Sequence, residues 1–313
     1  MSTNASATMT FRKRRKEINE ISGVSNTVIH IIFLIYSAAC LLPLLIVLAV
    51  SFTDQRMVTL HGYSLIPRQF SLAAYQYLLY DSAQIIKAYG VSILVTVAGT
   101  AVSVLVTALI AYPLSRQDFA FRHIFAFYVF FTMIFNGGLV PWYLVWTDVF
   151  SIRDTLFALV VPNHLMSAFF VMIMRTFFKS SIHGSIIESA SIDGAGEWRI
   201  LFRIVLPLSL PVLATIGLFN TLNYWNDWFN SLVFIGNRDM YTLQYLMYKV
   251  LMNIQFLSSN PEISRVAGNQ LAMLPAETAR MAMAIVGIGP IVLAYPFFQR
   301  YFVKGLTVGA IKG

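Results

Sequence analysis

Charged residues are scarce in this chain. They make up 12% of its 313 residues, whereas 58% of the residues are hydrophobic, and the mean hydropathy is +0.69. So little polar surface cannot coat a water-soluble globule of this size. Cysteine is nearly absent too, because Cys40 is the only one, which excludes an intrachain disulfide and a cysteine-based zinc cluster. The bilayer is therefore the expected solvent.

The patterns of nucleotide binding and catalysis are missing as well. The sequence has no GxxxxGK[ST] phosphate loop, and Gly287 and Gly289 lie in an apolar run without the strand and turn that such a loop needs. The five histidines are scattered without HExxH spacing, and no serine occupies a GxSxG elbow. We therefore expect no catalytic residue, no metal site and no cofactor bound by this chain itself.

Six apolar runs are long enough to cross a bilayer as α-helices, for which about 20 residues are needed. In hydrocarbon every backbone polar group must be satisfied internally, and runs without strict alternation fit helices rather than barrel strands. The predicted fold class is all-α integral membrane with six transmembrane helices. We predict these helices at residues 28–52, 88–112, 123–145, 156–178, 208–232 and 281–303.

Lysine and arginine set the expected orientation, because short, positively charged segments stay on the cytoplasmic side. With both ends inside, fourteen of the 22 basic residues are cytoplasmic, among them the run Arg12 to Lys16. We expect a multi-pass protein of the bacterial inner membrane with both termini in the cytoplasm. The formal charge of +8 then reflects topology and contact with anionic membrane lipid, and we expect no nucleic acid among the partners.

The chain divides into a transmembrane domain at 28–303 and cytoplasmic tails at 1–27 and 304–313. A periplasmic loop is expected at 233–280. It is far longer than the usual connector of about 2 to 8 residues between adjacent helices, so we expect it to contain structure and to meet a partner. A cytoplasmic loop is expected at 179–207.

This cytoplasmic loop has the pattern of two short helices. Ser185 and Glu188 have the spacing of a capping box, although Ser181 could cap a slightly longer helix, and Gly194 can provide a left-handed C-cap. Small residues and an apolar face favour close docking of another protein. The alternative is a helix that lies on the membrane or on its own bundle.

The same loop resembles the EAA loop of permease subunits of ATP-binding-cassette (ABC) importers, in which Glu-Ala-Ala is followed by Asp-Gly-Ala and Ile-x-Leu-Pro. Ser189 replaces the first alanine of that pattern, and His183 stands where many relatives have proline. The resemblance implies the type I importer permease fold with a cytoplasmic coupling helix. By this resemblance the residues that couple the permease to an ATPase are Glu188, Ser189, Ala190, Asp193, Gly194, Leu206 and Pro207.

Two further motifs narrow the resemblance. The run Asn-Tyr-Trp-Asn-Asp-Trp at 223–228 is similar to carbohydrate-importing permeases, and Phe-Asn-Gly-Gly-Leu-Val-Pro at 135–141 is similar to the branch that imports oligosaccharides, with alginate importers most similar in pattern. The function implied is one half of an oligosaccharide path that works by alternating access. The chain would be no enzyme, because ATP and Mg would bind to partner subunits.

The resemblance also implies the partners. These are a second permease subunit, expected to form a heterodimer with this chain, two ATP-binding-cassette ATPase subunits and a periplasmic sugar-binding protein.

Polar residues gather in the fifth predicted helix, where amides and carboxylates facing lipid are costly. At 100° per residue its four asparagines and one aspartate fall within an arc of about 120°, with two aromatic residues at the edge. Such a stripe suits sugars, because hydroxyls need donors and acceptors while C–H faces pack on rings; hydrogen bonding between helices explains it equally well. The candidate path residues are Asn220, Asn223, Tyr224, Asn226, Asp227, Trp228, Asn230 and, in the third helix, Asn136.

Three rival functions are weaker on the sequence alone. A secondary transporter would show internal repeats, paired interrupted helices and buried coupling charges, and none of these is visible in the sequence. A membrane-embedded enzyme would need converging histidines or carboxylates, whereas Asp227 has no visible partner. Only the coupling loop argues against the third rival, an assembly or scaffold protein.

Overall fold

The computed structural model describes residues 23–259 and 275–310. Within these ranges the secondary structure is helical, and the strand pairing is confined to one bridge between Thr53 and Phe70. Three long helices match predicted ones: α1 (Gly23–Ser51), α4 (Ser82–Ser115) and α17 (Ala276–Ala310). The predicted all-α fold class is confirmed, and α1 and α4 are each long and apolar enough to cross a membrane.

The other three predicted helices are interrupted, and the structure divides each of them into shorter helices. The third consists of α5 (Arg122–Ile134), α6 (Leu139–Leu144) and a π-helical turn η2 (Val145–Val149), with a bend of 117°. The fourth consists of α7 (Leu156–Val160) and α8 (Ala168–Ser181), and the fifth of α12 (Leu210–Trp225) and α13 (Phe229–Phe234).

Each interruption has a local cause. Between α5 and α6 the Asn136 Oδ1 accepts the Gly138 N–H at 2.8 Å, and Gly138 has a φ of 88° that favours a residue without Cβ. Between α7 and α8 stand Pro162, which has no N–H to donate, and Asn163, with a φ of 67°. Between α12 and α13 the Asp227 side chain bonds the backbone of the next helix instead of continuing the first.

The cytoplasmic loop of the prediction and the segments at the other end of the molecule are also helical. The loop contains α9 (Gly184–Ile192), α10 (Glu197–Ile200), a π-helical turn η3 (Leu201–Val205) and α11 (Leu206–Leu208). The segment α10–α11 meets α12 at 81° and could form one bent membrane span with it, as could the pair at α5 and α6. The described part of the chain thus has two to four helical segments that meet a length and hydropathy test for crossing.

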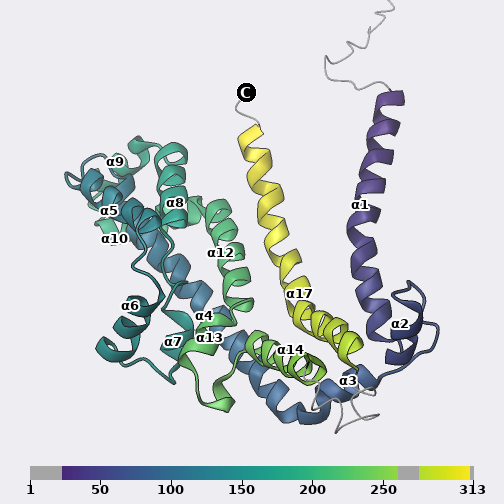
Figure 1. Ribbon diagram of the computed structural model, residues 1–313. Coiled ribbons are helices and arrows are strands. Elements are labelled where there is room, and N and C mark those ends of the chain that lie inside the picture. The colour runs from purple at the N-terminus through teal and green to yellow at the C-terminus, as the bar shows by residue number, and fades with distance from the viewer. Residues whose placement is uncertain (1–22, 260–274, 311–313) are drawn as a thin grey trace, which may run out of the picture.

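The opposite end holds α2 (Gln55–His61), α3 (Ala73–Leu78), η1 (Leu79–Asp81), η4 (Arg238–Met240) and α14 (Leu243–Ser259). The long segment 233–280 therefore contains helices of its own, while its residues 260–274 lie outside the described ranges. Figure 1 shows α9, α10, the first residues of α1 and the last residues of α17 at one end of the molecule, and α2, α3 and α14 at the other.

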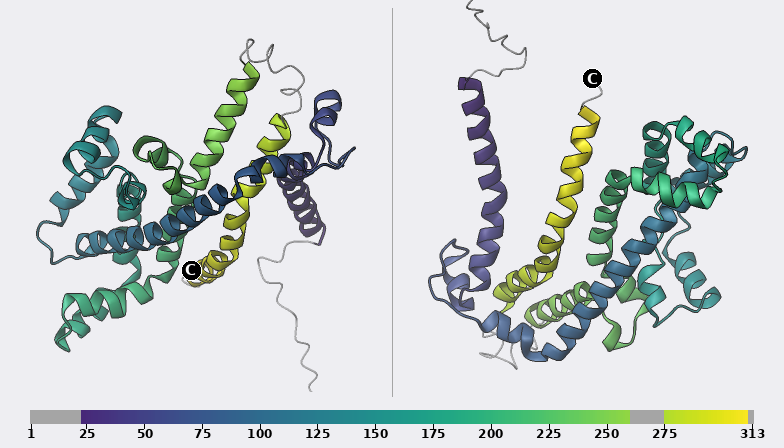
Figure 2. Two further views of the ribbon diagram at one scale, coloured as in Figure 1. Left: turned by 90° about the horizontal axis from the view of Figure 1, so that it is seen from below. Right: turned by 180° about the vertical axis from the view of Figure 1, so that it is seen from behind.

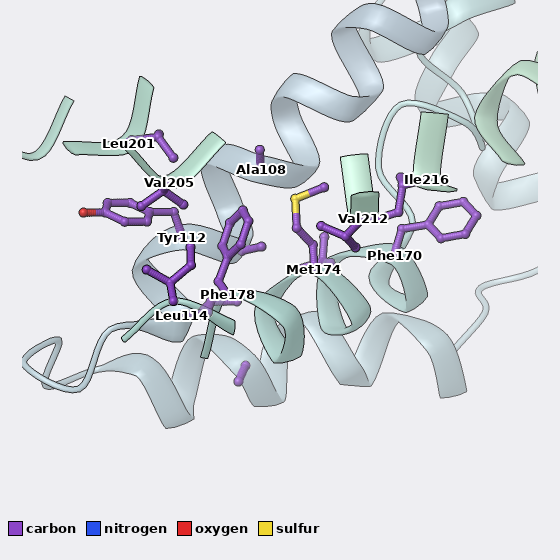
Figure 3. Packing of buried hydrophobic residues seen from close by; sticks show 14 of the residues in the cluster. Ala108, Tyr112, Leu114, Phe170, Met174, Phe178, Leu201, Val205, Val212 and Ile216 are labelled. Carbon is purple, nitrogen blue, oxygen red and sulfur yellow. The ribbon is translucent and has the colours of Figure 1, made fainter. Parts of the chain in front are cut away.

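Helix α4 is the centre of the packing, with α12 and α8 against it. The largest core cluster joins residues of α4, α8, η3 and α12, and Figure 3 shows Tyr112 of α4 lying beside Leu201 and Val205 of η3. Helix α1 packs chiefly against α17, and none of its most apolar stretch is buried. The right-hand view in Figure 2 shows α17 between α1 and α12, and α17 packs against both.

Candidate functional site: an exposed helical loop and a polar network at the helix breaks

The loop between α9 and α10 has a fixed turn. The Ala195 N–H donates to the Ala190 carbonyl at 2.9 Å, and the Gly194 N–H donates to the Ser191 carbonyl at 3.1 Å. This is the bond pattern of a Schellman motif, and Gly194 supplies its left-handed residue with a φ of 77°. The predicted left-handed C-cap is therefore present, and it sets the direction in which α10 leaves α9.

The helix start differs from the prediction. Helix α9 begins at Gly184 with His183 as its N-cap, and no side chain bonds the cap, so the capping box of Ser185 and Glu188 does not form. Residue Ser185 is already inside the helix, where its own backbone is helical and cannot serve as the cap.

The loop presents apolar side chains to its surroundings. Helix α9 has no buried residue, and only Ile187, Ala190 and Ala195 pack on the core cluster. Ile192 is 86% exposed and Trp198 is 69% exposed. Exposed apolar side chains on a sharply turned loop are typical of a surface that another protein covers.

Helix α12 is held to the break between α7 and α8 through α4. The Asn220 Nδ2 donates to the Ser103 Oγ at 3.0 Å, and the Ser103 hydroxyl donates to the His164 carbonyl at 3.0 Å. One turn further along α12 the Tyr224 hydroxyl donates to the Val160 carbonyl at 2.8 Å. These bonds satisfy carbonyls that the broken helix leaves without an intrahelical partner.

The same break is tied to the break between α12 and α13. The Asn230 Nδ2 donates to the Pro162 carbonyl at 3.0 Å, and the Asn163 Nδ2 donates to the Asn230 Oδ1 at 3.2 Å. The Nε2 of His164 lies 3.3 Å from the Oδ2 of Asp227. Two interrupted helices therefore meet through amides and one histidine–aspartate contact.

Asp227 also caps a helix. Its Oδ1 accepts the backbone N–H groups of Phe229 at 2.9 Å and Asn230 at 3.1 Å, which caps the start of α13. The aspartate therefore uses one oxygen to begin a helix and the other to hold His164.

The predicted single polar stripe is wrong, because α12 ends at Trp225 and a rotation of 100° per residue cannot be continued through Asn226 to Trp228. The structure divides the candidate path residues by exposure. Asn220, Tyr224 and Asn230 are buried and bonded to neighbouring segments. The exposed ones are Asn136, Asn223, Asn226 and Trp228, and Trp228 stacks on Tyr248 at 4.4 Å between ring centroids.

Sequence reasoning missed three residues of this network: Ser103, Asn163 and His164. The signal that could have found two of them is Pro162-Asn163 within the fourth predicted helix, because both residue types favour a break. Ser103 gave no such signal, since a serine in an apolar helix is ordinary and only its neighbours reveal its role.

Comparison with known proteins decides the family. Residues 103–308 match the family model of the binding-protein-dependent transport system inner membrane component. The chain belongs to this family. Its members are non-catalytic membrane subunits of ABC transporters, and the resemblance seen in the EAA-like loop is thereby confirmed at the level of the family.

Individual relatives are similar in sequence to this permease over most of its length. It is 38% identical over 280 residues, covering 90% of this chain and 95% of the relative, to the polygalacturonan/rhamnogalacturonan transport system permease protein YtcP of Bacillus subtilis. It is 34% identical to protein LplC of the same species, covering 88% of this chain and 90% of the relative. In fold it is similar to a chain of a bacterial ABC transporter involved in the import of the acidic polysaccharide alginate, with a TM-score of 0.74 and 30% sequence identity. The match covers 89% of this chain and 96% of that chain.

The structure corrects one expectation from the sequence. Paired interrupted helices and buried coupling charges were expected of a secondary transporter and not of this chain, yet the described residues contain interrupted helices and a largely buried contact between His164 and Asp227. The family match, rather than the absence of such features, therefore excludes a secondary transporter and an enzyme.

Proposed function

We propose that this permease is one half of the translocation path of an ATP-driven importer, and that it moves an oligosaccharide by alternating access. In this proposal ATP and Mg bind to two partner ATPase subunits. A periplasmic binding protein delivers the sugar, and a second, different permease completes the path as a heterodimer. The termini and the α9–α10 loop face the cytoplasm.

The observation that carries the proposal is the α9–α10 loop. It combines a fixed Schellman turn with exposed apolar side chains at Ile192 and Trp198. The loop lies at the end of the molecule where both described chain ends lie (Figure 1). In this proposal the ATPase docks there, and the coupling residues are Glu188, Ser189, Ala190, Asp193, Gly194, Leu206 and Pro207.

The proposed substrate class is an acidic oligosaccharide. Its support is that a relative named for polygalacturonan transport and a solved alginate importer are both similar to this chain over about nine-tenths of its length. Polygalacturonan and alginate are both polymers of uronic acids. Among the candidate path residues, Asn223 and Trp228 are exposed and can meet a sugar, whereas Asn220 and Asn230 are engaged in packing.

The experiment uses the complete complex: this chain copurified with its second permease and ATPase, reconstituted in proteoliposomes with the binding protein. ATPase activity is measured with trimers of galacturonate, of alginate and of arabinose. Stimulation by the uronate trimers only is expected; stimulation by the arabinose trimer alone would reject the acidic class, and stimulation by none would reject the importer.

Substitution of Gly194 tests whether the ATPase docks on the α9–α10 loop. A Cβ at this position meets nothing within 4 Å, so Gly194→Trp adds bulk to an open surface and strains a φ of 77°. The matched control is Gly194→Asn, because asparagine tolerates the left-handed region. Loss of stimulation in the tryptophan variant, with the asparagine variant near wild type, is expected. Equal stimulation in all three proteins would remove this loop from the coupling interface.

A further inference from the structure

Glu197, the first residue of α10, joins the exposed loop to the central helix. Its Oε2 accepts the hydroxyl of Tyr112, at 2.5 Å, and its Oε1 lies 3.3 Å from a guanidinium nitrogen of Arg116. Tyr112 lies in the last turn of α4, and Arg116 follows directly after this helix.

Among the described residues 184–200, Glu197 has the only side chain that hydrogen-bonds outside the loop. The other contacts of the loop with the body are apolar, through Ile187, Ala190, Ala195 and Ile200. Apolar contacts are not directional and allow sliding. A hydrogen bond from a fixed donor resists it, because the bond weakens steeply when its geometry is lost.

Tyr112 gives this bond a donor whose position is fixed. The residue is 7% exposed and its ring belongs to the main core cluster (Figure 3), so the position of the hydroxyl follows that of α4. Displacement of α10 therefore favours displacement of α4 with it.

Helix α4 connects the Glu197–Tyr112 bond to the hydrogen bonds of Ser103. Tyr112 and Ser103 lie on the same helix, nine residues or about 13 Å apart at 1.5 Å per residue. Ser103 bonds both Asn220 of α12 and the carbonyl of His164. Tyr112 also precedes Pro113, the one proline inside α4, so a kink at Pro113 would separate Arg116, but not Tyr112, from the rest of the helix.

We propose that Glu197 is a positioning residue that transmits the movement of the α9–α10 loop to α4 through the Tyr112 hydroxyl, and that α4 carries this movement to Ser103 and the helix breaks. The inference rests on the proposed function, since it assumes an ATPase at the loop. It adds a specific mechanical link that the docking surface alone does not provide.

The test compares transport with ATP hydrolysis. Glu197→Gln and Tyr112→Phe are reconstituted with the partners and the binding protein, and sugar uptake per ATP hydrolysed is measured with the trimer that stimulates the wild type. Asp118→Asn is the matched control: Asp118 accepts two bonds from Arg116, at 2.7 and 3.0 Å, but none from α10. The control removes a neighbouring ion pair and leaves the Glu197–Tyr112 contact in place.

We expect Tyr112→Phe and Glu197→Gln to keep stimulated ATPase activity near wild type. Uptake per ATP should fall about 5-fold or more, which is within the usual range for loss of coupling between two sites. Asp118→Asn should leave the ratio unchanged. An unchanged ratio in both variants would overturn the proposal, and so would a parallel fall of uptake, ATPase activity and complex yield, which indicates a purely structural contact.

A second measurement does not depend on the sugar. In a Cys40→Ser background, Asn226→Cys places a thiol at the exposed end of α12, where the native side chain bonds only its own helix. The rate of maleimide labelling is compared with and without ATP and vanadate. We expect ATP-dependent labelling to disappear when Glu197→Gln is added; a change as large as in the parent protein would overturn the link. Failure of the ATPase to copurify would instead contradict the proposed function.

Discussion

The Nε2 of His164 lies 3.3 Å from the Oδ2 of Asp227, and the pair joins two helix breaks that are 63 residues apart in the sequence. Both side chains are largely buried, with exposed fractions of 22% and 10%. Ionisable side chains within a membrane domain are rare and are found where partners bond them. Here the aspartate has three partners, because its other oxygen caps α13.

Asp227→Ala should destabilise the complex more than Asp227→Asn does. Alanine removes the helix cap and leaves His164 without its partner, at a cost of about 1 to 3 kcal/mol, whereas asparagine keeps an oxygen that can accept from Phe229 and Asn230. The thermal unfolding midpoint of the purified complex measures the difference. Equal midpoints for the two variants would mean that the cap contributes nothing and that only the charge matters.

Gly99 of α4 should tolerate no side chain. A Cβ there would meet the ring of Tyr224 at 2.6 Å, and this ring cannot rotate away because it is buried and its hydroxyl is bonded to Val160. Gly99→Ala should therefore cost about 1 to 3 kcal/mol as overpacking. Gly90→Ala, in the same helix with nothing within 4 Å of a Cβ, is the control and should be neutral or slightly stabilising.

Gly287 of α17 is a comparison for Gly99 in which the neighbouring side chain can move. Its Cβ would also approach an atom at 2.6 Å, but this atom is the Cε of Met247, the end of a flexible side chain. Gly287→Ala should therefore be milder than Gly99→Ala when the unfolding midpoints are compared. A loss as large as that of Gly99→Ala would show that distance, and not the mobility of the neighbour, decides the cost.

The sequence predicts the helical class and α1, α4 and α17 well, because these helices follow from uninterrupted hydropathy, a local property. The breaks near Pro162 and Asp227 were missed, because hydropathy counts residues and takes no account of carbonyls that need new donors. The turn at Gly194 was predictable, since its left-handed geometry strongly favours glycine. The His164–Asp227 and Glu197–Tyr112 contacts were not, because they join segments that only tertiary packing brings together.

Asp154 should make the contact between two loops sensitive to acid. Its Oδ1 accepts the N–H groups of Asn237 at 2.9 Å and Gly236 at 2.6 Å, and these bonds hold the pKa of the carboxyl below its usual range. A lowered pKa in the folded state means that the contact is stabilised above the ordinary aspartate pKa and is lost as the pH falls through the folded value. Hydrogen exchange at Gly236 and Asn237 should therefore accelerate below about pH 4.

Asp154→Asn separates this effect from general acid denaturation. The variant carries no titrating carboxyl, so exchange at the two amides should be faster than in the wild type already at pH 7 and should lose the additional acid step. Exchange that is unchanged at pH 7 would show that the charge of Asp154 does not hold the loop.

Tyr89 of α4 should compensate for a proline in α17. Its hydroxyl donates to the Val286 carbonyl at 2.6 Å, and the residue four positions later, Pro290, has no N–H to donate to that carbonyl. Tyr89→Phe would leave the carbonyl without either donor, at about 1 to 2 kcal/mol. The measurement is the unfolding midpoint of the complex.

The decisive comparison is a double-mutant cycle with Pro290→Ala. Alanine restores a helical N–H to Val286, so Tyr89→Phe should cost less in that background than in the wild type, and the difference between the two costs is the coupling between the tyrosine and the proline. Equal costs in the two backgrounds would mean that Tyr89 acts through packing alone. Trp225, whose Nε1 donates to the neighbouring Gly287 carbonyl at 2.8 Å, would then be the side chain that holds this part of α17 to the α12 end of the bundle.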